Sequence, residues 1–216
     1  MAISRPFATK RGKAAVAAAI IAAAAGGWNS FVGSKVMPAH PDITPVIVHQ
    51  AVNKGITPPA VILAVDLIKK WEGLRLRAYV DMVGVVTVCY GETLINGKPV
   101  KLGMTFTAAD CEAMLLKRVT RDYFLPLVDR VQGFTMAPDS VQASLVSLGY
   151  NVGVGTAAKS SSARDVTRND YDQACVDLGK FAYAGGEFVQ GLSNRRGMGD
   201  AGRAGEGEIC KSGLKT

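Results

Sequence analysis

The sequence contains 216 residues, enough for one domain with an appended segment, and its composition of 48% hydrophobic and 20% charged residues is ordinary for a globular protein. The net charge of +7 favours an anionic partner, such as nucleic acid, a membrane surface or the acidic bacterial cell wall. Nucleic acid is the least favoured, because no lysine- and arginine-rich block is interleaved with aromatic residues and no nucleic-acid-binding motif is present.

Residues 1–34 have the pattern of a membrane-targeting segment. Residues 1–13 carry basic residues and no acid, and residues 14–34 carry no charge. As a helix, these 21 uncharged residues are long enough to cross the bilayer, whose hydrocarbon core is about 30 Å thick. The basic flank is expected to stay in the cytoplasm, which places the rest of the chain on the far side.

The uncharged span is weakly apolar, because alanine and glycine fill most of it. Three interpretations are open. A signal peptide would be cleaved at an A-x-A site around residues 22–25. A permanent anchor would normally be richer in leucine. The third interpretation, which we favour, is an uncleaved anchor that is held weakly and can later leave the membrane.

The cysteines indicate the compartment. They are widely spaced without a CxxC pair, and both histidines lie upstream of them (Cys89, Cys111, Cys175, Cys210; His40, His49). This arrangement predicts no zinc site, and we expect neither metal nor cofactor. Four such cysteines behind a targeting segment predict two disulfides in an oxidising compartment, with three possible connectivities. The alternative is buried free thiols in a cytosolic protein.

Two helices are predicted before the middle of the chain. Residues 35–57 begin as a proline-rich linker and contain a short helix at 45–54, which starts at Thr44-Pro45. From residue 58, apolar residues recur at helical spacing as far as Trp71. Glu72 lies at the C-terminal end of this second helix, and the glycine that follows stops it.

A small sheet and a set of helices follow. Strands are predicted at 74–79 and 85–90 around a turn at 81–84, with a third near 98–101. Helices are predicted at 107–122, 138–151 and 169–181, with a loop at 160–162 and a glycine-rich stretch at 184–207. A small sheet joined to a helical lobe is an α+β layout. The predicted divisions are therefore a targeting segment (1–34), a linker (35–57) and a folded domain (58–216).

Glu72, Asp81 and Thr87 are the candidate catalytic residues, with eight residues between the first two and five between the last two. Hydrolysis of a glycosidic bond typically uses one carboxyl group as proton donor and a second to attack or to activate water. Glu72 suits the donor because it ends an apolar helix beside Trp71 and Leu74, while Asp81 lies in a polar turn. Thr87 could hold the attacking water. Taken singly, each has an ordinary role as a surface, turn or strand residue.

The joint pattern is more specific. The stretch EGLRLRAYVDMVGVVTVCYGET closely resembles the phage-type lysozymes, glycoside hydrolase family 24, whose pattern is roughly EGxRLxAYxDxxGxxTIGYGHT. Three later blocks, LVSLGYNVGVG, FAYAGG and GLSNRR, follow in the family's order. The resemblance implies a lysozyme-like fold with the active site between the two lobes. It also implies an endolysin that cuts the β-1,4 bond between N-acetylmuramic acid and N-acetylglucosamine in peptidoglycan. Glu72 would be the acid, and Asp81 and Thr87 would position water for inversion.

The four cysteines and the alanine-rich N-terminus resemble one subgroup, the signal-anchor-release endolysins of phages that infect Gram-negative bacteria. This likeness implies export by the host secretion machinery and an inactive form held on the periplasmic side of the inner membrane through residues 14–34. Release to the periplasm would follow collapse of the membrane potential. We expect a monomer with the disulfide pairs Cys89–Cys111 and Cys175–Cys210.

Two departures from the family pattern stand out. Glu92 occupies the position of a histidine in many relatives, so any polar partner there should have changed sign. Relatives run GLxxRRxxExxxC as one helix, whereas here a glycine-rich insertion at 197–205 comes before Glu206. The insertion is expected to loop out, which leaves the packing roles of Arg195 and Arg196 open.

Two other classes of function are considered. The first is a peptidoglycan-binding protein with a lysozyme fold and no activity, which the loss of an active-site residue would favour. The second is a lysis protein that acts on the membrane through its N-terminal helix, which leaves the spacing of the three candidate residues unexplained.

Overall fold

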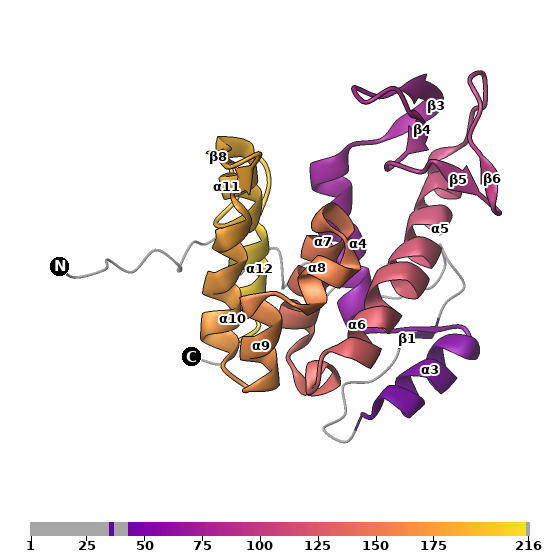
Figure 1. Cartoon of the computed structure of the whole chain (residues 1–216). Helices are drawn as coiled ribbons and strands as arrows, with labels where there is room; N and C mark the ends of the chain where they lie inside the picture. Colours follow the sequence, from indigo (N-terminus) through magenta and orange to yellow (C-terminus); the bar gives the residue numbers. More distant parts are fainter. Residues whose placement is uncertain (1–34, 37–42, 215–216) are drawn as a thin grey trace.

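The computed structural model describes residues 35–36 and 43–214 (Figure 1). The predicted membrane segment at 14–34 lies outside these residues, so the proposed domain divisions stay a prediction. Within the described part of the chain, no helix is both long enough and apolar enough to cross a bilayer. Helices make up most of the body, and four short strands, β3 to β6, gather at one end of α4 and α5 (Figure 1).

The expected short helix is confirmed as α3 (Pro45–Asn53). The Thr44 hydroxyl caps it by accepting a hydrogen bond from the Ile47 N–H at 3.4 Å. Two short parallel strands, β1 (Lys35–Val36) and β2 (Ile56–Thr57), lie on either side of α3 in the sequence.

The second helix, α4 (Pro59–Glu72), carries the first candidate residue at its last position. Its apolar face is buried against α7 (Asp139–Val152). Gly73 adopts φ +72°, a backbone conformation that glycine tolerates better than other residues, and ends the helix. The chain then enters the sheet.

Strands β3 to β6 form two hairpins, each of which is a two-stranded sheet of its own. β3 (Arg75–Val80) pairs antiparallel with β4 (Val86–Cys89), and Tyr79 lies opposite Thr87. Beyond them, β5 (Leu94–Ile95) pairs with β6 (Lys98–Pro99). The two predicted main strands are confirmed within one or two residues, and the expected third strand is β6, whose partner β5 was not predicted.

The helix predicted at 107–122 does not end there. It starts as α5 (Ala108–Arg118), whose capping box joins Thr107 and Asp110. It continues through a π-helix, η1 (Val119–Phe124), into α6 (Leu125–Arg130). Pro126 lacks an N–H and cannot donate an ordinary helical bond to residue 122, and the π turn ends just before it, where the Leu125 N–H donates to the Thr120 carbonyl.

The helical lobe is centred on α7, which is buried along 140–149 and packs against α4, α8, α12 and η1. The remaining short helices follow in order: η2 (Phe134–Met136), α8 (Val154–Ala158), α9 (Ser161–Thr167), α10 (Tyr171–Asp177), η3 (Leu178–Phe181), α11 (Gln190–Arg196) and α12 (Glu206–Ser212). A hairpin of β7 (Tyr183–Ala184) and β8 (Glu187–Phe188) precedes α11.

The loop predicted at 160–162 is wrong. The Ser160 side chain accepts a hydrogen bond from the Ala163 N–H at 3.0 Å and so caps α9. Serine favours helix caps and loops for the same reason, because its short side chain competes for nearby backbone groups.

Both expected disulfides, Cys89–Cys111 and Cys175–Cys210, are present. The first joins β4 to α5, and the second joins α10 to α12. The first disulfide therefore ties the small sheet to a helix, and the second ties together two helices of the helical lobe.

Candidate active site

Glu72 lies where α4 meets the chain that leads to the sheet. Its Oε1 accepts a hydrogen bond from Arg195 Nη1 at 2.7 Å, and 26% of its side chain is exposed. The apolar setting predicted from Trp71 and Leu74 is therefore wrong in one respect, since a cation lies against the carboxylate. Arg195 is 123 residues away in the sequence. No local pattern could have identified it.

Asp81 and Thr87 are brought together by the β3–β4 turn. Asp81 Oδ1 accepts hydrogen bonds from the N–H groups of Val83 (2.9 Å) and Val85 (2.8 Å). Asp81 Oδ2 faces the Thr87 hydroxyl at 3.5 Å, and the same hydroxyl lies 3.2 Å from the Val85 carbonyl. Thr87 is buried, with 5% exposed. The turn thus fixes one carboxylate oxygen and leaves the other beside a hydroxyl.

A buried charge network supports Glu72 from behind. Arg195 Nε lies 3.3 Å from Glu206 Oε1, which also accepts hydrogen bonds from Arg196 and, at 2.7 Å, from the Ser147 hydroxyl. Arg196 and Glu206 are both completely buried, and Arg196 also donates to Asn151. The open question about the two arginines is answered, because both keep packing roles.

The insertion at 197–205, here called the α11–α12 loop, interrupts what would otherwise be a continuous helix from α11 to α12. The Glu208 N–H donates to the Gly197 carbonyl at 3.1 Å. In an α-helix such a bond joins residues four positions apart, and here seven additional residues lie between them. A Cβ on Gly205 would lie 2.2 Å from the Gly197 carbonyl oxygen, and one on Gly199 only 2.0 Å from that of Arg203. The expectation that this region loops out is confirmed. At these two positions the neighbouring backbone leaves no room for a side chain, so glycine is required.

The α11–α12 loop lies against the residue before Glu72. Trp71 Nε1 donates to the Ala204 carbonyl at 3.0 Å, and the guanidinium carbon of Arg203 lies 4.0 Å from the Trp71 ring centroid. The Arg203 Nε donates to Asp200 Oδ2 at 2.9 Å. These contacts could not be predicted from the sequence, because Trp71 and Ala204 are 133 residues apart.

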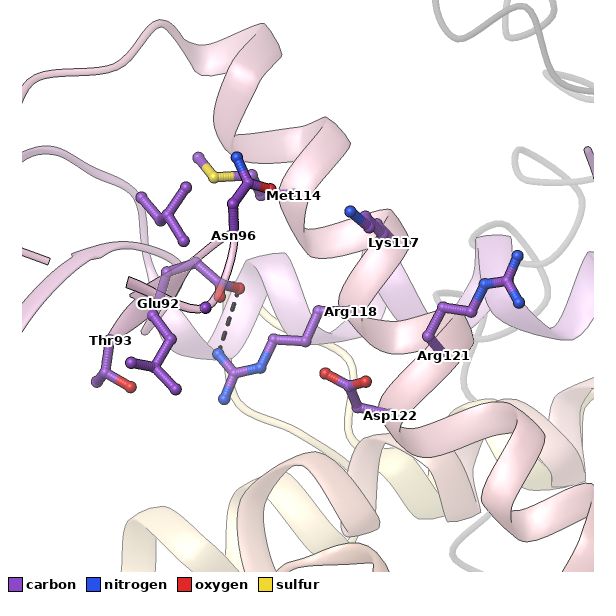
Figure 2. Close-up of a pocket in the computed structure, with 11 residues that line it drawn as sticks. Glu92, Thr93, Asn96, Met114, Lys117, Arg118, Arg121 and Asp122 are labelled. Carbon is purple, nitrogen blue, oxygen red and sulfur yellow. Dashed lines mark ion pairs between the residues drawn. The ribbon is translucent and has the colours of Figure 1, made fainter. Parts of the chain in front are cut away.

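Glu92, whose role the sequence left open, has a cationic partner. Its carboxylate is turned toward Arg118 in a pocket of about 390 Å³ between the β5–β6 hairpin and α5–η1, with 3.2 Å between Oε1 and Nη1 (Figure 2). Glu92 is 6% exposed, and burial raises its pKa although Arg118 opposes the shift. Arg118 also donates to the Gly91 carbonyl at 3.0 Å and lies over the Tyr150 ring.

The charged side chains do not gather as metal ligands. Within 35–36 and 43–214, no group of three or more histidine, cysteine, aspartate or glutamate side chains is placed to hold an ion. The chemistry that the arrangement offers is that of two carboxyl groups and a hydroxyl, with Glu72 on the helical side of Gly73 and the other two on the hairpin side.

Comparison with known proteins places the chain in a family. The family model for phage lysozyme matches residues 69–198, which include Glu72, Asp81 and Thr87. The SAR-endolysin of bacteriophage PS119 is 36% identical over 127 residues, which are 58% of this chain and 71% of the relative. The SAR-endolysin of bacteriophage PS34 is 34% identical over 141 residues, 64% and 75% of the two chains.

The fold agrees with this match. The endolysin from Escherichia coli O157:H7 phage FAHEc1 superimposes with a TM-score of 0.59 at 30% identity, covering 68% of this chain and 90% of that chain. The α+β lysozyme-like architecture expected from the sequence is therefore confirmed. By its matched residues, its relatives and its fold, the chain belongs to the phage lysozyme family.

Proposed function

We propose that the protein is a phage endolysin with muramidase activity, acting as a monomer. It hydrolyses the β-1,4 bond between N-acetylmuramic acid and N-acetylglucosamine in peptidoglycan and thereby releases phage progeny from the host. Membership of the phage lysozyme family and the match to endolysin relatives, which are 34–36% identical to this chain over the aligned residues, support this proposal.

The observation that carries the proposal is the pairing of Asp81 Oδ2 with the Thr87 hydroxyl. Because two backbone N–H groups occupy Asp81 Oδ1, its Oδ2 is the oxygen left to accept a proton from water. When the Thr87 hydroxyl donates to the Val85 carbonyl, its oxygen can accept a hydrogen bond from the second O–H of the same water. A water held in this way attacks as Asp81 polarises it, in an inverting displacement.

Glu72 donates the proton to the leaving sugar oxygen in this scheme. It lies on the far side of Gly73 from Asp81 and Thr87, so the sugar chain would bind between the helical lobe and the hairpin. Arg195 holds the carboxylate in one orientation until substrate arrives. Each of the three residues thus has a distinct role.

We further propose export by the host secretion machinery and attachment to the inner membrane, on its periplasmic side, through residues 14–34. Two disulfides suit a periplasmic protein, and the relatives are named SAR-endolysins. Mass spectrometry of the exported protein tests this step. An intact N-terminus supports the weak anchor that later leaves the membrane, and a mature N-terminus near residue 26 would rule it out in favour of cleavage.

The activity is tested by clearing of chloroform-treated Gram-negative cells, followed by turbidity. The wild-type protein should clear them, Glu72→Gln should not, and Glu187→Gln, at an exposed position of β8 next to α11, should clear as wild type does. Unfolding midpoints establish that the variants fold. Clearing by Glu72→Gln would contradict the assignment, and a wild-type protein that binds the wall without clearing would favour the inactive wall-binding alternative.

A further inference from the structure

We propose that the α11–α12 loop positions the proton donor, with Arg203 and Trp71 as positioning residues that act through Glu72. The inference rests on the proposed function, because it assigns a role in that reaction to an insertion that departs from the family pattern. It follows from three features: how the end of α4 is held, how the loop is held, and where the chain can bend.

Two consecutive residues at the end of α4 are held by the same C-terminal segment. Arg195 of α11 donates to the Glu72 carboxylate at 2.7 Å. Nine residues later, the Ala204 carbonyl accepts the Trp71 indole N–H at 3.0 Å, and Arg203 covers the indole ring at 4.0 Å. The last turn of a helix frays easily when nothing holds it. Here both the Trp71 indole and the Glu72 carboxylate are held by residues of the helical lobe.

The loop that holds Trp71 is internally fixed. Asp200 Oδ1 accepts hydrogen bonds from the N–H groups of Gly202 (3.0 Å) and Arg203 (2.9 Å), and its Oδ2 accepts two from the Arg203 guanidinium. The Asp200 N–H donates back to the Arg203 carbonyl at 2.8 Å. A planar guanidinium held by a carboxylate in this manner has one orientation. Arg203 can therefore act as a fixed surface for the indole.

The contact between the α11–α12 loop and Trp71 lies where it can affect the placement of Glu72. Gly73 separates Glu72 from the strand that leads to Asp81, and its φ of +72° is the point at which the chain turns. The proton donor must therefore follow the helical lobe, while the groups that hold water follow the hairpin. A loop that ties Trp71 to the helical lobe sets the donor's distance from the water, and small errors in such distances slow reactions strongly.

The contact is not needed for the core. The Arg203 side chain is 42% exposed and its bonding partners are in the loop itself, so its removal should leave the fold intact. Its loss should lower kcat and leave KM nearly unchanged, because substrate still binds but the donor is misplaced. A purely structural role would instead lower the unfolding midpoint.

The experiment measures hydrolysis of soluble glycan strands and tryptophan emission in full-length protein carrying Trp28→Phe, so that Trp71 is the remaining tryptophan. In Arg203→Ala, kcat should fall about tenfold with KM within about twofold, and Trp71 emission should shift to longer wavelength. Arg203→Lys should recover part of kcat because it keeps a cation near the ring. The control, Arg164→Ala, removes an exposed arginine from α9 and should match the parent protein.

A second variant removes the loop while keeping the helix. Deletion of residues 198–204 joins Gly197 to Gly205 and restores the family spacing between Arg196 and Glu206, and the Glu208–Gly197 bond becomes an ordinary helical one. This variant should fold and show the same fall in kcat as Arg203→Ala.

The proposal is overturned if Arg203→Ala and the deletion both keep the kcat of the parent protein, or if kcat falls only together with the unfolding midpoint. If Glu72→Gln is inactive while these variants are fully active, the proposed function stands and the positioning role fails. If the parent protein is itself inactive on glycan, both fail, whereas the emission shift still reports whether Arg203 covers Trp71.

Discussion

The Thr87 hydroxyl has one proton and two acceptors within reach, the Asp81 carboxylate at 3.5 Å and the Val85 carbonyl at 3.2 Å. Only one of these bonds can form at a time. In the free protein the hydroxyl can alternate between them. In the proposed reaction it points to the carbonyl, because the carboxylate is then occupied by water.

Substitution at Thr87 tests this assignment. Thr87→Val keeps the shape of the side chain and removes the hydroxyl, so kcat should fall on the order of 100-fold, as is typical when one positioned polar group is lost. Thr87→Ser keeps the hydroxyl and should retain most of the activity. Steady-state hydrolysis of soluble glycan strands measures both, and equal activity of the valine and serine variants would contradict a role for the hydroxyl.

Glu92 provides a pH test of stability. Burial raises the pKa of this carboxyl, and Arg118 only partly offsets the shift, so the folded protein binds the proton more tightly than the unfolded chain does. As pH rises from the ordinary pKa of a glutamate through the raised one, the folded state therefore loses stability relative to the unfolded state.

Glu92→Gln removes this effect. The free energy of unfolding of wild type minus that of Glu92→Gln should decrease as pH rises from about 4 toward neutrality, and should be level at lower pH. Denaturant titrations of both proteins across this range give the difference. A difference that increases with pH would show that the ion pair with Arg118 outweighs burial.

At the scale of residues, the sequence located the candidate catalytic groups but not their partners. Asp81 and Thr87 could be placed together because a turn and two strands bring them close through local geometry. The role of Glu92 stayed open, because the family pattern has a histidine at this position. The identities of Arg118 and Arg195 depend on how distant helices pack, which local patterns do not encode.

At the scale of elements, strong periodicity and caps were sufficient for α3, α4, α7 and the β3–β4 hairpin. Predictions of secondary structure were wrong where the same residue type occurs in two kinds of structure. Ser160 caps α9 although serine runs are common in loops, and Pro126 lies in the first turn of α6, directly after a π turn, although proline usually ends a helix. In both places the surrounding helices decide the outcome.

The contact among α7, α11 and α12 depends on one carboxylate. Glu206 Oε1 receives donors from Ser147, Arg195 and Arg196, and the Ser144 hydroxyl donates to the Glu206 carbonyl at 2.9 Å. Two arginines and one glutamate are therefore buried together. Removing only the negative charge takes away the carboxylate that pairs with the buried Arg196 and leaves Arg195 with Glu72 as its acidic partner.

Glu206→Gln should lower the free energy of unfolding by about 3–5 kcal/mol, the usual loss when one partner of a buried ion pair is removed. Glu187→Gln, at an exposed position of β8, should change it by less than about 0.5 kcal/mol. Denaturant unfolding measures both. A loss in Glu206→Gln as small as in the control would mean that the arginines are not held by this charge.

At the scale of the whole molecule, the candidate site joins two parts of the protein. The helical lobe supplies Glu72, Arg195 and the α11–α12 loop, and the small sheet supplies Asp81 and Thr87 at the far end of α4 (Figure 1). The net charge of +7 favours binding to an acidic cell wall. The sequence indicated this two-part layout, whereas the packing between the parts required the structure.

The proposed role of Glu72 is to protonate the glycosidic oxygen of the bond that follows N-acetylmuramic acid. It is tested most directly by digesting purified peptidoglycan, reducing the new ends with borohydride and identifying the reduced sugar by mass spectrometry. The wild-type protein should yield reduced N-acetylmuramic acid, and Glu72→Gln, folded to the same unfolding midpoint, should yield none. New ends at N-acetylglucosamine, cleavage confined to the peptides, or undiminished product from Glu72→Gln would contradict the account.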